Sequence, residues 1–378
     1  MSYATPVYIE SSLKKAWEMG LLISTSSIAG LIFDFLVNRF VKSKPYKVYL
    51  LRAILLALLF PVILLTLPPT YLIFLLGMMV WGVYYELIRF SDFHFIHTYF
   101  GRNEHAKSWG ILITFKSVAY AAGPLLASLL ISRVFKIAFS TSIVFVSASL
   151  LAFLVFSKTH KVKLQDEPIK GQSLIKEYKA WLILLRKIWP LWLFIFSIFL
   201  VDATFWTIGT VLSEILKTRD AAAGRFLLTA YMLPSLFIGF AAQKASIRLG
   251  KKRTAIISGL ASGLILALFG FCSNTYILLG LAFSASIFSG LAVPEVMAVF
   301  EDFVARLERF KDDVISLERT GENLAYILGP IVSGFLAQFY GFQKVFSIMG
   351  LFLAATSAVA LCVTPRKVRL PQSELKST

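Results

Sequence analysis

Long apolar segments recur along the whole chain, and they constrain the fold more than any other feature. A helix that crosses the hydrocarbon core of a bilayer needs about 20 mostly apolar residues. About eleven segments of this length are present. They lie at roughly 18–38, 48–68, 71–98, 109–132, 135–156, 188–213, 225–246, 253–272, 275–302, 316–338 and 342–364. We therefore predict an all-α, polytopic membrane protein.

The composition excludes the main soluble classes. Apolar residues make up 57% of the 378 residues and charged residues 16%, with a mean hydropathy of +0.75. Soluble domains carry roughly 45–50% apolar and about 25% charged residues. A soluble enzyme, a disordered chain and a disulfide scaffold are thus excluded. The two cysteines, Cys272 and Cys362, fall at opposite ends of their spans, about a membrane thickness apart, so they cannot pair.

The formal net charge of +17 has two explanations. In a soluble protein it would indicate a nucleic-acid partner. Here the basic residues of alternate loops number about 27 against 8, and the positive-inside rule places the basic-rich loops in the cytoplasm. We therefore expect no nucleic acid, and a multi-pass protein of the cell membrane whose C-terminus and central loop are cytoplasmic.

One polar stretch divides the chain. Residues 157–187 separate an N-terminal bundle, 1–156, from a C-terminal bundle, 188–365, and residues 366–378 form a cytoplasmic tail. From Leu174 to Lys187, apolar residues and lysines alternate at helical spacing. This pattern is typical of an amphipathic helix at the cytoplasmic interface. A solvated tether accounts for it equally well.

The two halves contain a repeat. The pattern Ala-Tyr-x-x-Gly-Pro occurs once in each half, inside spans that run from the cytoplasm outward. It ends in Gly123 and Pro124 in the first half, and in Gly329 and Pro330 in the second. Parallel repeats of this kind characterise one large class of secondary transporter.

A second pattern makes the resemblance specific. Residues 30–34, ending in Asp34, resemble the start of the cytoplasmic Gly-x-x-x-Asp-Arg-x-Gly-Arg motif of the major facilitator superfamily, with Phe35 where that family has arginine. A complementary fragment begins at Arg248. The resemblance implies two pseudo-symmetric six-helix bundles that rock about a central site, by alternating access.

The resemblance also affects the span count. If Asp34 ends the family's second helix, residues 1–17 form the external loop before it, and the first bundle is one helix short. Two explanations stand: a start codon placed too late, which we favour, or a chain with eleven true spans.

Ionisable groups within spans are costly and are therefore functional candidates. Asp202 lies in the span at 188–213, while Glu86 and Glu295 occupy matching places in the two halves. The resemblance implies that these spans line the cavity. A low-dielectric site favours the neutral form of a carboxyl, so proton coupling is expected there. Arg89, three residues after Glu86, lies on the same helical face and can neutralise it. The alternatives are a structural, hydrogen-bonded Asp202 and a purely internal Glu86–Arg89 ion pair.

Other residues are candidates for helix pairing or gating. Lys116 and Glu322 precede their Gly-Pro pairs by the same interval and carry opposite charges, so we expect them to pair across the two-fold axis. The resemblance implies that Asp34 clamps a neighbouring helix end opposite the basic cluster at Arg248. Gly123, Pro124, Gly329 and Pro330 complete this set.

No catalytic or metal site is predicted. Asp92, His94 and His97 are close in sequence, but Asp92 is rotated away from both histidines, and a polar helix end explains them better than a metal site. The sequence has no phosphate-binding loop and no nucleophile elbow, so we expect neither an enzyme nor a cofactor.

We therefore predict a monomeric secondary transporter of a small organic solute, coupled to protons. Efflux of amphiphiles is favoured over uptake because acids and aromatic residues lie together. Lipid-facing positions would explain most of the aromatic residues equally well. The rivals are a non-transporting membrane protein, either a sensor or an assembly partner, and an intramembrane enzyme acting on lipids.

Overall fold

The computed structural model describes residues 1–40, 45–99, 105–131, 134–159, 174–238, 250–307 and 311–365. These ranges are helical and contain no strand, which confirms the all-α prediction. The hydropathy of the sequence explains this result. Within a bilayer no water is available to the backbone, and a helix satisfies its N–H and C=O groups inside one segment.

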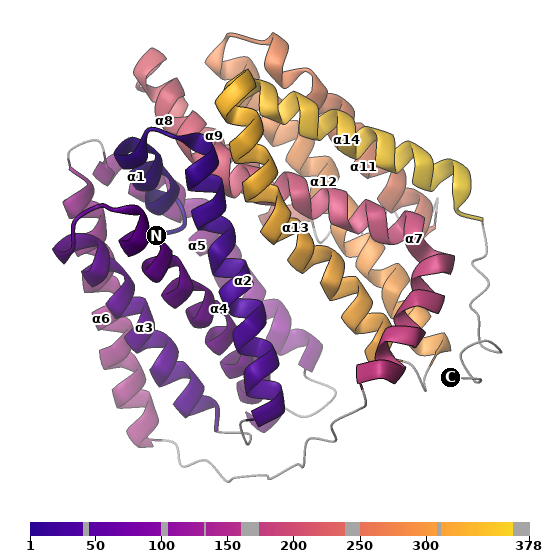
Figure 1. Ribbon diagram of the computed structural model, residues 1–378, viewed down its shortest axis with the longest axis horizontal. Coiled ribbons are helices and arrows are strands. Elements are labelled where there is room, and N and C mark those ends of the chain that lie inside the picture. The colour runs from indigo at the N-terminus through magenta and orange to yellow at the C-terminus, as the bar shows by residue number, and fades with distance from the viewer. Residues whose placement is uncertain are drawn as a thin grey trace. The chain divides into compact units, whose positions relative to one another are not determined.

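Two compact units make up the chain, residues 1–171 and residues 172–378, called here the first and the second unit. The first unit, coloured indigo to purple in Figure 1, is a bundle of helices. Its helices are α1 (Ala4–Leu13), α2 (Ala16–Phe40), α3 (Tyr46–Thr66), α4 (Tyr71–Tyr99), α5 (His105–Ile131) and α6 (Phe135–Thr159).

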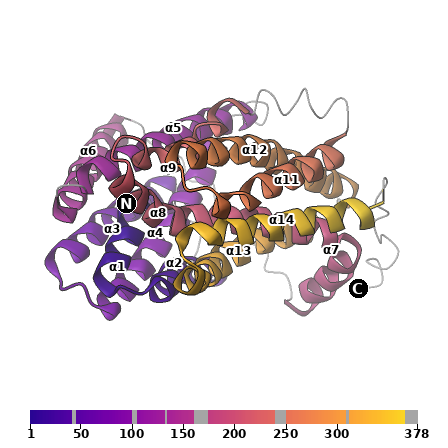
Figure 2. The ribbon, with the colours of Figure 1, turned by 90° about the horizontal axis from the view of Figure 1, so that it is seen from above.

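The second unit begins with a helix that changes type along its length. The helices of this unit are α7 (Leu174–Thr204), the π-helical turn η2 (Phe205–Gly209), α8 (Thr210–Arg219), the 3-10 turn η3 (Gly224–Phe226), α9 (Leu227–Met232), α11 (Lys251–Ala267), the 3-10 turn η4 (Phe269–Phe271), α12 (Thr275–Arg306), α13 (Lys311–Tyr340) and α14 (Phe342–Val363). Packing places α11 between α12 and α14, as Figure 2 shows.

Nine helices in the described part of the chain are long and apolar enough to cross a membrane. The remaining two predicted spans differ for identifiable reasons. The span at 316–338 corresponds to α13, which is long enough but begins with charged residues such as Glu318 and Arg319. The span at 225–246 corresponds to a shorter apolar segment, Gly224–Ile238, and its remainder lies outside the described residues.

Two segments that we placed outside the spans differ from expectation. Residues 1–17, expected as an external loop, contain helix α1, in which Val7 and Ile9 are buried. The hydroxyl of Ser2 lies 3.1 Å from that of Tyr85 in α4, so this segment packs into the first unit. The stretch from Leu174 to Lys187, expected as an interfacial helix or a tether, is the first part of α7 and continues into the span without a break. Residues 160–173 and the predicted tail, 366–378, lie outside the described residues.

In the first unit, α2 and α4 pack closely because one of the facing residues is a glycine. A Cβ atom added at Gly82 in α4 would lie 1.9 Å from the carbonyl oxygen of Ser26 in α2. Beside this contact, Tyr49 and Ala53 of α3 and Leu87 of α4 form a buried cluster. Small residues at such contacts let helix backbones approach closely in membranes, where van der Waals packing drives association.

In the second unit, α7 and α13 run side by side in the same direction. The indole of Trp192 donates a 2.9 Å hydrogen bond to the carbonyl of Leu317 at the start of this contact. Farther along, a Cβ atom added at Gly329 would lie 2.7 Å from the Cβ of Ala203. Gly329 of the Gly-Pro pair therefore sets the distance between the two helices beside Asp202.

The repeated Gly-Pro pairs provide a matched test of this packing. A Cβ atom added at Gly123, the equivalent position of the first unit, would meet nothing within 4 Å. We expect Gly329→Ala to lower the stability of the purified protein by about 1–3 kcal/mol, because the helices must separate. Gly123→Ala should be neutral, or stabilise by up to about 1 kcal/mol through helix propensity. Thermal unfolding in detergent measures both, and equal losses in the two variants would contradict the packing described.

Candidate functional site

Asp202 is the centre of a polar cluster within the second unit. It lies near the end of α7, and its half-buried carboxylate accepts hydrogen bonds from two tyrosines. The hydroxyl of Tyr231 in α9 donates to Oδ1 at 2.9 Å, and that of Tyr326 in α13 donates to Oδ2 at 2.6 Å. Each carboxylate oxygen is thus held by a phenol from a different helix. Bonds to an ionised acceptor are roughly twice as strong as neutral ones.

The helix changes type directly after this cluster. Residues Phe205–Gly209 form a π-helical turn, a rare element that is frequent at functional sites. Side-chain hydroxyls bond back to the backbone around it: Thr204 donates to the carbonyl of Leu200 and Thr207 to that of Ala203, each at 2.8 Å. Such back-bonding bends helices slightly. The sequence therefore produces an irregular helix where the carboxylate lies.

Tyr231 is held in place by its ring and by its backbone. The ring stacks on that of Phe205, with centroids 3.7 Å apart and planes inclined by 10°. Its backbone carbonyl accepts a hydrogen bond from the hydroxyl of Ser286 in α12. Tyr231 is 6% exposed, so its phenol has little freedom to point elsewhere.

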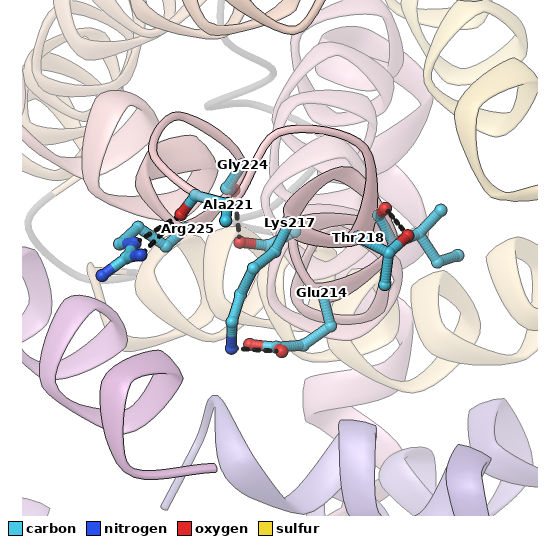
Figure 3. Close-up of polar contacts among 8 residues, drawn as sticks. Glu214, Lys217, Thr218, Ala221, Gly224 and Arg225 are labelled. Atoms are coloured by element: carbon cyan, nitrogen blue, oxygen red, sulfur yellow. Dashed lines mark hydrogen bonds and ion pairs between the residues drawn. The ribbon is translucent and has the colours of Figure 1, made fainter. Parts of the chain in front are cut away.

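A tight turn after α8, whose polar contacts Figure 3 shows, leads to α9, which carries Tyr231 and packs against α8 and η2. Gly224 allows the close approach, because a Cβ atom there would lie 2.2 Å from the backbone nitrogen of Lys217. The hydroxyl of Ser213 donates to the carbonyl of Gly224 at 2.9 Å, and the Arg225 guanidinium donates to the carbonyl of Ala221. This turn is well connected and fixes where α9 begins.

Tyr326 reaches Asp202 because of the repeated pattern. It is the tyrosine of the Ala-Tyr-x-x-Gly-Pro pattern and lies about one helical turn before Gly329. Gly329 brings α13 against Ala203, the residue after Asp202. The tyrosine and the glycine of the pattern therefore both contribute to the contact between α13 and α7. Pro330 is buried in the same helix.

In the first unit, the predicted Glu86–Arg89 pair is present and has a third member. The Arg89 guanidinium lies 2.7 Å from Oε2 of Glu86 and 3.2 Å from Oδ2 of Asp34. Asp34 is on α2 and the other two are on α4, so the cluster joins these helices. Arg248, the expected counterpart of Asp34, lies outside the described residues.

Lys116 has an acidic partner within its own unit. Its ammonium lies 2.6 Å from Oδ2 of Asp92. This ion pair joins α5 to α4 within the first unit. Glu322 belongs to α13 of the second unit, and its pairing with Lys116 stays a prediction.

The remaining candidates are spread over both units. Glu295 lies in α12 and is 5% exposed, and no described contact brings it to Asp202. His94 stacks on Tyr49 at 5.3 Å, in the manner of a packed helix residue, and the side chain of His97 is not among those described. Gly123 and Pro124 lie in α5.

Sequence reasoning found Asp202 and missed the residues that hold it. Tyr326 carried a usable signal, because it occupies the same place in both copies of the repeat. Tyr231 had none, since an aromatic residue in an apolar segment is usually a packing residue. The π-helical turn also leaves no distinct pattern in the sequence.

Comparisons with known proteins agree with this architecture. Residues 194–377 match the family model of the Major Facilitator Superfamily. A curated relative, the "Multi-drug resistance efflux pump PmrA" of Streptococcus pneumoniae serotype 4, is 27% identical over 113 residues, which are 30% of this chain. The same protein from strain R6 gives the same match. The matched stretch spans only 28% of the relative's length.

Solved structures share the fold over nearly the whole chain. A crystal structure of a peptide transporter POT in complex with sulfate has a TM-score of 0.74 at 12% identity, covering 97% of this chain and 92% of that one. A mutant of the nucleoside transporter NupG has the same TM-score at 16% identity, covering 95% and 94%. At these identities the likeness shows the fold. The family match over residues 194–377, just under half of the chain, and the shared fold support a non-enzymatic transporter of the major facilitator superfamily.

Proposed function

We propose that this protein is a secondary active transporter that moves a small organic solute by alternating access, coupled to protons at Asp202. The observation that carries the proposal is the Asp202 cluster. An ionisable carboxylate lies in a membrane-spanning helix, at a π-helical turn, and is held by hydroxyls from two other helices. Intramembrane acids mark solute and proton pathways.

The chemistry of the cluster suits reversible proton binding. The carboxylate has one phenol donor on each oxygen and no cation among the described contacts. A carboxylate paired with arginine or lysine would be held in its charged form by the neighbouring positive charge. Asp202 has the weaker support of neutral donors, so it is the acid best suited to exchange a proton during transport.

Three acids of the first unit, Asp34, Glu86 and Asp92, have cationic partners, so we assign them a structural and gating role. Arg89 lies between Glu86 and Asp34, and Lys116 holds Asp92. These pairs join α2 to α4 and α4 to α5. Breaking an ion pair inside a membrane leaves an uncompensated charge, which is strongly destabilising. The ion pairs therefore keep the first unit rigid as it moves. Glu295 remains a second candidate for the proton.

The proposed solute is an amphiphilic organic cation, moved outward. A cation would be attracted to the negative charge of the Asp202 carboxylate. The curated relative is named as a multidrug efflux pump, which supports efflux. We further propose a monomer in the cell membrane whose C-terminus and central polar stretch, 157–187, face the cytoplasm, from the distribution of basic residues.

The first prediction concerns coupling. In reconstituted vesicles, we expect Asp202→Asn to abolish solute accumulation driven by a pH gradient, while exchange of labelled for unlabelled solute without a gradient continues. The amide has the shape of the carboxyl but cannot release a proton. Asp302→Asn is the matched control, because Asp302 is an exposed acid that pairs with Lys251.

Unchanged gradient-driven accumulation in Asp202→Asn would refute the proposed coupling. Absence of solute movement by the wild-type protein, for every solute that binds it, would instead favour the rival, a non-transporting membrane protein.

The second prediction concerns the solute class. We expect amphiphilic cations to raise the thermal unfolding midpoint of purified protein, because a ligand at 100 times its Kd stabilises by about 2.7 kcal/mol. The shift should be reduced in Asp202→Asn, which removes the attraction of the carboxylate for the cation, and kept in Asp302→Asn. Stabilisation by neutral or anionic solutes only would contradict the assignment.

A further inference from the structure

We propose that Tyr231 and Tyr326 are positioning residues that hold Asp202 in its ionised form from two separate helices and set the pH at which it takes up a proton. The inference rests on the proposed function, in which Asp202 is the proton-binding group, and deepens it by naming what regulates that group. Neither tyrosine needs to touch the solute for this role.

The argument starts from the two oxygens of the carboxylate. An ionised carboxylate only accepts hydrogen bonds, and a phenol can donate one. Oδ1 receives the hydroxyl of Tyr231 at 2.9 Å, and Oδ2 receives that of Tyr326 at 2.6 Å. Both donors are therefore used, and each helix is joined to α7 through a different oxygen.

Proton uptake changes this arrangement. The proton binds to one of the two oxygens, which then becomes a hydroxyl and donates. The phenol facing that oxygen then accepts this hydrogen bond and turns its own O–H away, while the other phenol still donates to the carboxyl. Both bonds are now between neutral groups and are weaker than charge-assisted ones. Protonation therefore weakens the attachment of α9 and α13 to α7.

The surroundings hold the two rings in place, and the Ser289 side chain is a further hydrogen-bond partner of the Tyr231 phenol. Tyr231 is stacked on Phe205, and its carbonyl is bonded to Ser286. Tyr326 lies beside the ring of Phe199, with centroids 6.2 Å apart, on the helix that Gly329 holds against Ala203. Both rings therefore stay beside the carboxyl when its charge changes. The π-helical turn that begins at Phe205 is a point where α7 can change register.

Other ionisable groups lie on the helices around α7 and must be separated from Asp202. On α13, Glu322 lies about one turn before Tyr326, with Glu318 and Arg319 farther toward its start. On α12, Glu295 is buried, and on α14, Lys344 lies near the first residue. On α9, Tyr231 is the ionisable residue that faces Asp202. Glu322→Gln and Glu295→Gln are therefore required as controls.

The test is an infrared titration of the full chain in lipid nanodiscs. We expect a carboxyl C=O band that appears as the pH is lowered and that is absent in Asp202→Asn. Both control variants should retain it at the same midpoint. Tyr231→Phe and Tyr326→Phe should each move the midpoint to higher pH, by roughly one pH unit. Each variant removes one hydrogen bond to the charged form of the carboxyl. The double variant should move it farther than either.

A second readout in the same spectra separates positioning from a general structural effect. In the wild-type protein, a tyrosine C–O band should change together with the carboxyl band. Each phenylalanine variant should remove part of that change, and Asp202→Asn should remove all of it. A merely structural role would leave the midpoint unmoved. If Tyr326→Phe does not fold, Tyr231→Phe carries the same test, because the two phenols act on separate oxygens.

The proposal is overturned if the carboxyl band persists in Asp202→Asn, or if neither phenylalanine variant shifts its midpoint. The measurement uses no solute, so its outcome is independent of transport. A shifted midpoint in a protein that moves no solute would refute the proposed function and leave the role of the tyrosines intact.

Discussion

A carboxylate inside a membrane helix must have its charge compensated by groups of the protein, and the second unit is organised around this requirement. Asp202 meets it with two phenols, from α9 and α13. Several local features depend on that solution: the glycine that brings α13 close, the tight turn that returns α9, and the ring stacked on Tyr231. Taken singly, each is an ordinary packing detail. Together they place two hydroxyls on the two oxygens of one side chain.

The first unit meets the same requirement with cations. Arg89 lies within ion-pair distance of two acids and Lys116 within that of a third. A full positive charge holds a carboxylate ionised far more firmly than a neutral hydroxyl does. The acids at these positions in the two units therefore differ in chemical character. This difference is why we assign proton exchange to the second unit and rigidity to the first.

Much of the fold could be predicted from the sequence, because hydropathy is a property of whole segments. In lipid, a segment of this kind satisfies the hydrogen bonding of its backbone by forming a helix. Asp202 was predictable because an ionisable group inside an apolar span is energetically costly. Of its partners, Tyr326 was signalled by the repeat, but Tyr231 was not, because its contact depends on the π-helical turn and on how α8 returns to α9. The pairing of Lys116 with Glu322 stays a prediction, and the partner Asp92 was missed because symmetry of a repeat does not specify distance. The helix at Ala4–Leu13 was missed because the family resemblance implied a loop there.

The central claim is that solute and proton move together through Asp202, and the luminal pH of reconstituted vesicles tests it most directly. With no pH gradient imposed, adding a transported cation to one side should change the luminal pH in step with solute entry, and Asp202→Asn should abolish the pH change. Solute entry without proton movement in the wild-type protein, or an undiminished pH change in Asp202→Asn, would contradict the account.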